Sequence, residues 1–154
     1  MDPLNILLEQ AEAERNHALA AFNQTRARCD AAREQALQLD SYLADYQQRW
    51  SAQFARGAAL EIVRCYQGFA GRLDAAIAQQ AQAVTLAQAA QARAGDMLTA
   101  HELRVASVRK LIERRVHAER QVTDRREQRS ADETAMRMAR GRSGGGFGIR
   151  GARA

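Results

Sequence analysis

The residue types that carry most protein chemistry are few and scattered in this chain of 154 residues. Its histidines and cysteines stand at His17, His101, His117, Cys29 and Cys65. Neither cysteine has a C-x-x-C neighbour or a nearby histidine pair, which is the spacing that zinc sites use. A glycine-rich run at 144–148 follows no predicted strand, precedes no helix and lacks the lysine of a phosphate-binding loop. We therefore expect no enzymatic activity, no metal and no cofactor.

The composition indicates an elongated, all-α protein. The chain has 33 alanines, one proline and 5% aromatic residues. Alanine, glutamine, glutamate, arginine and leucine are strong helix formers, whereas β-branched and turn residues are scarce here. The net charge of +5 lies entirely in residues 113–154, since residues 1–112 carry 12 basic and 12 acidic side chains. This basic end is either a contact surface for an acidic partner or simply the charge that a solvated helix needs.

Apolar residues recur every seven positions along both halves of the chain, as in a coiled coil. In the second half, two interleaved rows of this seam are Val63, Ala70, Ile77, Val84, Gln91, Leu98, Val105 and Ile112, and Tyr66, Leu73, Gln80, Ala87, Ala94, His101 and Val108. An equivalent seam runs from Leu4 to Trp50, with Arg15 and Thr25 as its polar exceptions. A seven-residue repeat stays on one helix face only when that face winds around a partner helix.

Capping and breaking residues place the ends of two helices. Asp2 followed by Pro3 is a typical helix start, and Gly57 can end a helix in the left-handed conformation. A short connection makes neighbouring helices antiparallel. We predict an all-α fold, a two-helix antiparallel coiled-coil hairpin within one domain at 1–140, with helices at 3–55 and 59–140 joined by a turn at 56–58.

The register of the hairpin follows from its turn. Facing residues are expected to have numbers that sum to about 116, because this sum pairs the polar seam positions in matched layers. Thr25 then meets Gln91, and Arg15 meets His101. The two cysteines lie too far apart along the helices for a disulfide.

The second helix is longer than the first can cover. Beyond Ile112 the seam positions become charged, so 113–140 is expected to be a single exposed helix with pairs such as Glu133 with Arg137. A lone polar helix is marginal in water, so it frays or has a partner. Residues 141–154 are rich in glycine, contain three arginines and no acid, and are expected to form a disordered tail.

Large aromatic residues flank the seam near the turn. Two ridges lie at the same level: Phe69, Leu73, Ala76 and Gln80 on the second helix, and Leu43, Tyr46 and Trp50 on the first. One opposing helix cannot cover such side chains fully, and aromatic clusters are typical binding anchors. The alternative is that they only pack the tip, where Gly68 and Gly71 allow a close approach of the helices.

These residues resemble the flagellar type III export protein family FliJ. The resemblance covers roughly residues 5–140. It is carried by Asp45-Tyr46 with Trp50, by the run Tyr66, Phe69, Leu73, Ala76, Ile77 and Gln80, and by the charged segments 110–115, 124–128 and 132–135. The chain differs from the family pattern in its shorter connection around Gly57, in Trp50 where tyrosine is common, and in its glycine-arginine tail.

The resemblance implies a non-catalytic stalk, similar to the central shaft of rotary ATP synthases. Such a stalk enters the flagellar export ATPase ring, couples it to the cytoplasmic domain of the export gate, and assists export chaperones. The implied location is the cytoplasm, peripheral to the membrane at the flagellar base. Carried over residue by residue, the export-gate contact is Leu43, Tyr46, Trp50, Phe69, Leu73, Ala76 and Gln80. The ATPase contact is Arg114, Arg115, Arg125, Arg126, Arg129, Asp132 and Glu133.

Three other classes of protein share parts of this pattern. A stalk of a virulence type III secretion system has the same hairpin, and a generic coiled coil can simply dimerise. A nucleic-acid-binding protein would use the basic tail, but acids interleave with the arginines throughout 113–133, so no nucleic acid is expected. No apolar run reaches the roughly 18 residues of a membrane span and no signal peptide is visible, so no membrane insertion is expected.

Overall fold

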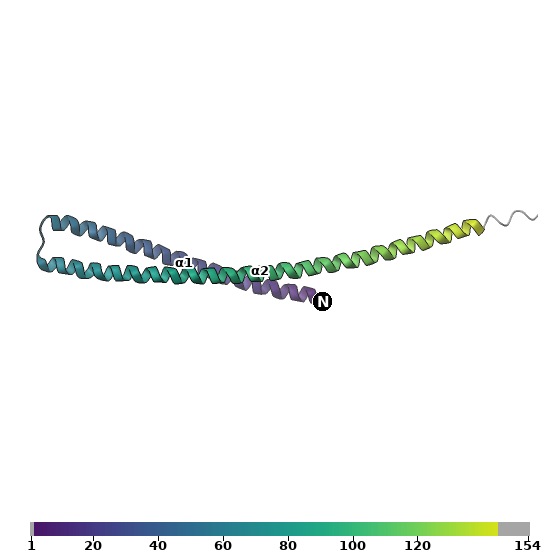
Figure 1. The fold of residues 1–154 in the computed structure, drawn as a ribbon, viewed down its shortest axis with the longest axis horizontal. Coiled ribbons are helices and arrows are strands. Elements are labelled where there is room, and N and C mark those ends of the chain that lie inside the picture. Colours follow the sequence, from purple (N-terminus) through teal and green to yellow (C-terminus); the bar gives the residue numbers. More distant parts are fainter. Residues whose placement is uncertain (1, 145–154) are drawn as a thin grey trace, which may run out of the picture.

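The protein is a long helical hairpin in the computed structural model, which describes residues 2–144. Helix α1 runs over Pro3–Ala55 and helix α2 over Leu60–Gly144. The two helices lie antiparallel and cross at a shallow angle, and the N-terminus lies beside the middle of α2 (Figure 1). The predicted all-α, two-helix hairpin with a longer second helix is confirmed.

Local chemistry sets the start of α1 and the turn. Asp2 caps α1, because its carboxylate accepts from the Leu4 backbone N–H at 3.2 Å. Gly57 has a φ of 92°, and its N–H donates to the Phe54 carbonyl at 3.1 Å. This positive φ suits glycine, which has no Cβ to clash with the following carbonyl. Gly57 therefore ends α1 as the sequence indicates.

The end of α2 differs from the expectation. The helix continues past Arg140 to Gly144, so residues 141–144 are helical and the prediction of a tail beginning at 141 is wrong. Elongation of an existing helix adds one hydrogen bond per residue, so a single glycine at position 141 does not stop it. Ser143 also turns back onto the helix, donating its hydroxyl to the Arg140 carbonyl at 3.0 Å. The rest of the predicted tail, 145–154, lies outside the described residues.

The interface between the helices follows the predicted seam. Every seam position of both helices is buried or half-buried. The most buried side chains are small apart from one leucine, namely Ala11, Ala18, Cys29, Leu73, Val105 and Val108. Ala11, Val105 and Val108 form one cluster, against which Leu7, Leu8 and Ile112 pack. The best-covered core thus lies near the start of α1, and both cysteines are free.

The register is close to the expected one, but the polar seam residues do not form the expected hydrogen bonds. Trp50 lies against Tyr66 at 5.8 Å between ring centroids, as a sum of about 116 requires. Thr25, however, donates its hydroxyl to the Phe22 carbonyl of its own helix at 2.8 Å. Arg15 donates to Asn16, and His101 lies 3.8 Å from Glu14. The hydrogen bonds of Thr25 and Arg15 among the described residues therefore stay within α1 and do not reach the expected partners Gln91 and His101.

The last part of α2 has no helix beside it. Every residue from Glu113 to Ser143 is exposed. We call this segment, 113–144, the overhang. At 1.5 Å per residue it extends about 45 Å beyond the start of α1, and Figure 1 shows it as the free end of α2.

Candidate partner-binding surfaces

The hairpin tip carries a continuous aromatic cluster. Tyr46 lies at its centre, with its ring centroid 4.7 Å from Phe69 and 5.4 Å from Tyr66. Trp50 and Phe54 extend the cluster toward the turn, and their ring centroids are 5.4 Å apart. Six rings, Tyr42, Tyr46, Trp50, Phe54, Tyr66 and Phe69, therefore form one chain of contacts across both helices. These centroid separations are the usual ones for favourable aromatic pairs.

The cluster is only partly covered by the two helices. Tyr42 is 53% exposed, and the other five aromatic residues are half-buried. A fully packed core would hide such rings, whereas these keep part of their apolar surface in water. The tip therefore presents an amphipathic aromatic surface on which a partner can bury further area.

The sequence-predicted gate residues do not all share this exposure. Tyr46, Trp50, Phe69, Leu43 and Ala76 are half-buried, so part of each side chain is accessible. Leu73 is only 8% exposed and belongs to the seam. Gln80 bridges the helices, donating to the Ala32 carbonyl at 2.9 Å and to Gln35 at 3.3 Å. Leu73 and Gln80 thus hold the helices together, while the accessible surface is aromatic.

Sequence reasoning left three members of this cluster out of the expected site. Tyr42 is the most exposed of them, and Phe54 and Tyr66 complete the contact with Trp50. The spacing of Tyr42, Tyr46, Trp50 and Phe54 is the available signal, because residues four apart lie on one helix face. Gly68 and Gly71 do not bring the helices together, since a Cβ added at either one meets no atom within 4 Å.

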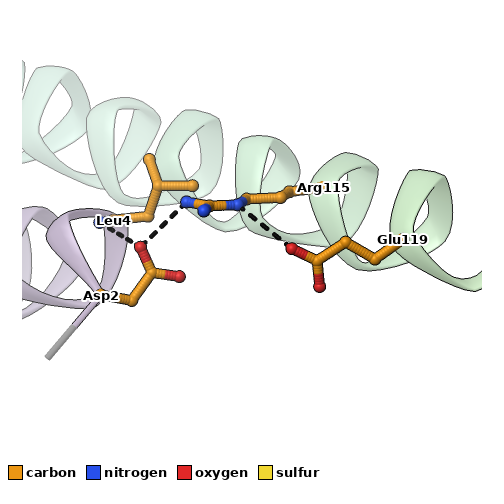
Figure 2. Close-up of polar contacts among 4 residues, drawn as sticks. All are labelled: Asp2, Leu4, Arg115 and Glu119. Carbon is orange, nitrogen blue, oxygen red and sulfur yellow. Dashed lines mark hydrogen bonds and ion pairs between the residues drawn. The ribbon is translucent and has the colours of Figure 1, made fainter.

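Charged side chains link the helices at the other end of the hairpin. Arg104 lies 3.0 Å from Glu14, and Arg109 lies 2.9 Å from Glu12. Arg115 is held between two carboxylates, 2.9 Å from Asp2 on α1 and 3.4 Å from Glu119 on α2 (Figure 2). Asp2 therefore caps α1 and also fixes it to the first turns of the overhang.

The remaining predicted ATPase residues lie on the overhang without neighbours from α1. Arg114, Arg125, Arg126, Arg129, Asp132 and Glu133 are all exposed. Among residues 2–144 none of these six forms an ion pair, and the expected pair of Glu133 with Arg137 is not formed. The overhang therefore presents charges that are available to a partner.

A groove between the helices is a feature that the sequence reasoning missed. Four alanines and a methionine form its walls beside Glu14, namely Ala13, Ala18, Ala21, Ala94 and Met97, with His17 and His101 also lining it. Alanines spaced at helical intervals on α1 were the available signal.

Two further features concern metal ligands and membrane-spanning helices. Within 2–144 there is no cluster of three or more histidine, cysteine or acidic residues that could hold a metal ion. Over the same range, no helix is both long enough and apolar enough to cross a membrane.

Comparison with known proteins gives one match. The sequence model of a family described as "Flagellar FliJ protein" matches residues 1–144, which is nearly the whole chain. No curated protein matches the chain, and no solved structure does.

Proposed function

Because this chain belongs to the flagellar FliJ family, and is thereby a component of flagellar protein export, we propose that it acts as a non-catalytic stalk. In this role one end engages the export ATPase ring and the other end engages the cytoplasmic domain of the export gate. A stalk of this kind couples its two partners mechanically, because it is stiff, and it catalyses no reaction.

One observation carries this proposal: the two accessible surfaces of the hairpin lie at opposite ends of one continuous helix. Helix α2 contributes Tyr66 and Phe69 to the aromatic tip and the whole of the overhang. It contains no proline, and its bounds are unbroken from Leu60 to Gly144. An 85-residue helix is about 130 Å long at 1.5 Å per residue. Partners at its two ends are therefore linked without contacting each other.

The aromatic tip is the proposed export-gate contact. The half-buried rings of Tyr46, Trp50 and Phe69, together with the exposed Tyr42, offer apolar area on a rigid support. Tyrosine and tryptophan are the residue types that dominate binding energy at protein interfaces. Leu73 and Gln80 support this surface from the seam rather than contacting the partner.

The overhang is the proposed ATPase contact. It is slim and charged, and α1 does not lie beside it, which suits a segment that lies inside a ring. Its arginines outnumber its acids, with 9 against 6 in residues 113–144. An excess of one charge sign steers association with a complementary surface.

Two further parts of the proposal rest on family membership. We propose that the chain also contacts export chaperones, and that it works in the cytoplasm at the flagellar base. A stalk of a virulence type III secretion system is the alternative with the same geometry, and the identity of the bound ATPase distinguishes the two.

The test is a pull-down with two separate baits, the flagellar export ATPase and the gate domain. Full-length chain is expected to bind both. Deletion of 113–154 should lose the ATPase and keep the gate, while Tyr42→Ala with Phe69→Ala should do the reverse. Leu86→Ala is a matched control, because Leu86 is exposed and distant from the aromatic cluster. Unchanged gate binding by a helical tip variant contradicts the tip assignment, and unchanged ATPase binding after the deletion contradicts the overhang assignment.

A further inference from the structure

Arginines recur at a constant interval of eleven residues along the second half of α2. They stand at positions 93, 104, 115, 126 and 137. Eleven residues make three helical turns and about 20° more, so these side chains form one row that drifts slowly around the helix. We call Arg104, Arg115, Arg126 and Arg137 the arginine row, because Arg93 faces a part of α1, residues 16–29, that has no acidic side chain.

The first two members of the arginine row are paired with α1. Arg104 lies 3.0 Å from Glu14 and Arg115 lies 2.9 Å from Asp2. Glu14 and Asp2 are twelve residues apart, which matches the eleven-residue spacing of their partners on an antiparallel helix. Figure 2 shows the last of these pairs, where Arg115 meets the first turn of α1.

The last two members continue the row past the start of α1. Continued in steps of seven past Ile112, the two rows of the seam reach positions 115, 126 and 136, so Arg126 stands at a seam position and Arg137 directly beside one. They therefore face the path that α1 would follow if it were extended. Both are exposed, and within residues 2–144 neither is in an ion pair.

We infer that the overhang binds an acidic helix of a partner protein, which lies end to end with α1 and runs in the same direction. Two carboxylates eleven or twelve residues apart on that helix pair with Arg126 and Arg137, repeating the arrangement of Asp2 and Glu14. This inference rests on the proposed function, in which the ATPase supplies the partner surface.

Charge decides which occupant fits. The overhang of a second copy carries the same excess of arginines over acids, 9 against 6, so its net charge opposes association with this one. The acids of a second copy that match the row, Asp2 and Glu14, are already paired within their own hairpin. Exposed ion pairs are individually weak, so the row fixes direction, register and rate of association rather than supplying most of the affinity.

A charge-reversal experiment with a matched control tests the inference. Arg126→Glu with Arg137→Glu reverses the free part of the row. Arg120→Glu with Arg142→Glu makes the same change in net charge on the overhang, but on the outer side of the helix, and neither residue belongs to the predicted ATPase contact. Binding of the full-length chain to the flagellar export ATPase is measured at low and high salt.

The row variant is expected to bind at least about tenfold more weakly at low salt, and its matched control within about threefold of the parent, because only the former removes close pairs. Equal losses in both variants overturn the inference in favour of overall charge. No loss in the row variant overturns it as well. Failure of the parent chain to bind the ATPase contradicts the proposed function instead.

A second measurement tests the row without the ATPase. In the full chain, Pro3→Ala and a designed helix of 24 residues placed before Asp2 extend α1 along the overhang, with glutamates opposite Arg126 and Arg137. The control extension carries glutamines at these two positions, since glutamine and glutamate have similar helix propensity. Amide hydrogen exchange of residues 120–140 is expected to slow at least about threefold more with glutamate than with glutamine. Equal protection by the two extensions, or protection by neither, overturns the inference.

Discussion

Near the start of α1 the two helices meet through small side chains and ion pairs, whereas near Gly57 they meet through aromatic rings. Ala11, Val105 and Val108 are 1%, 3% and 5% exposed, while the rings at the tip stay half-buried or exposed. Small residues let two helices approach until each covers the other. Large rings exceed what one opposing helix can cover, so the same seam gives a closed core at one end and an accessible surface at the other.

This difference separates stability from recognition along one rod. At the end with the closed core, arginines of α2 pair with Glu12, Glu14 and Asp2 of α1. The exposed overhang begins directly beyond this end. At the aromatic end, the rings hold the two helices together and also leave part of their apolar surface exposed to solvent. Changes at the closed core should therefore cost folding stability alone, and changes at the tip should affect stability less and binding more.

The largest effect is expected from a charge in the closed core. Val105→Asp places a carboxylate at a position that is 3% exposed, so we expect a loss of about 3 kcal/mol in the free energy of unfolding. Thermal and urea unfolding followed by circular dichroism measure it. Val116→Asp is the control, because Val116 is 41% exposed on the overhang and should change stability by less than about 0.5 kcal/mol. Similar losses in both variants would show that the core is not closed at Val105.

A smaller loss is expected at the centre of the aromatic cluster. Tyr46→Ala removes a ring that contacts four others, but its half-buried position limits the cost to about 2 kcal/mol, below the range for fully buried aromatics. Trp50 is the only tryptophan of the chain, so its fluorescence reports unfolding of the tip while circular dichroism reports the whole hairpin. Tyr46→Phe keeps the ring and should restore stability. A loss as large as that of Val105→Asp would contradict the contrast between the two ends.

Two glycines separate backbone effects from packing effects. Gly57→Ala puts a Cβ on a residue with a φ of 92°, which should destabilise the hairpin by about 1–2 kcal/mol. Gly68 lies within α2, two turns from its start, where an added Cβ meets no atom within 4 Å, so Gly68→Ala should stabilise the hairpin by about 0.5–1 kcal/mol. Urea unfolding of the two variants checks the opposite signs. A destabilising Gly68→Ala would indicate that the helices pack closely at Gly68 after all.

Much of the fold can be predicted from the sequence, because it depends on local patterns. The heptad spacing locates the seam, Asp2 and Pro3 start α1, and Gly57 ends it, because periodicity, capping and the left-handed conformation depend on few residues. The turn then fixes the register of the whole hairpin. The place where α2 ends is harder to predict, since elongation past Gly141 balances small terms of opposite sign.

The candidate site is harder to predict, because it depends on the hydrogen bonds and the burial of each side chain in the packed structure. Thr25 donates its hydroxyl to a carbonyl of its own helix, as serine and threonine often do, so matching polar seam positions did not predict its hydrogen bond. The ridge of predicted gate residues mixes accessible rings with the buried Leu73 and the bridging Gln80, and only the packed structure distinguishes them. The roles of these residues in binding stay a prediction.

The smallest effect is expected from the ion pairs that close the N-terminal end. Arg109→Gln removes the pair with Glu12, whose side chains are 55% and 33% exposed, so the loss at low salt should be about 0.5 kcal/mol. In 1 M salt, where the screening length is about 3 Å, the variant and the parent should have equal stability. Arg120→Gln, on the overhang and in no ion pair among residues 2–144, is the control and should show no salt-dependent difference. A salt-independent loss in Arg109→Gln would mean that the arginine stabilises this end by packing its aliphatic stem rather than by its charge.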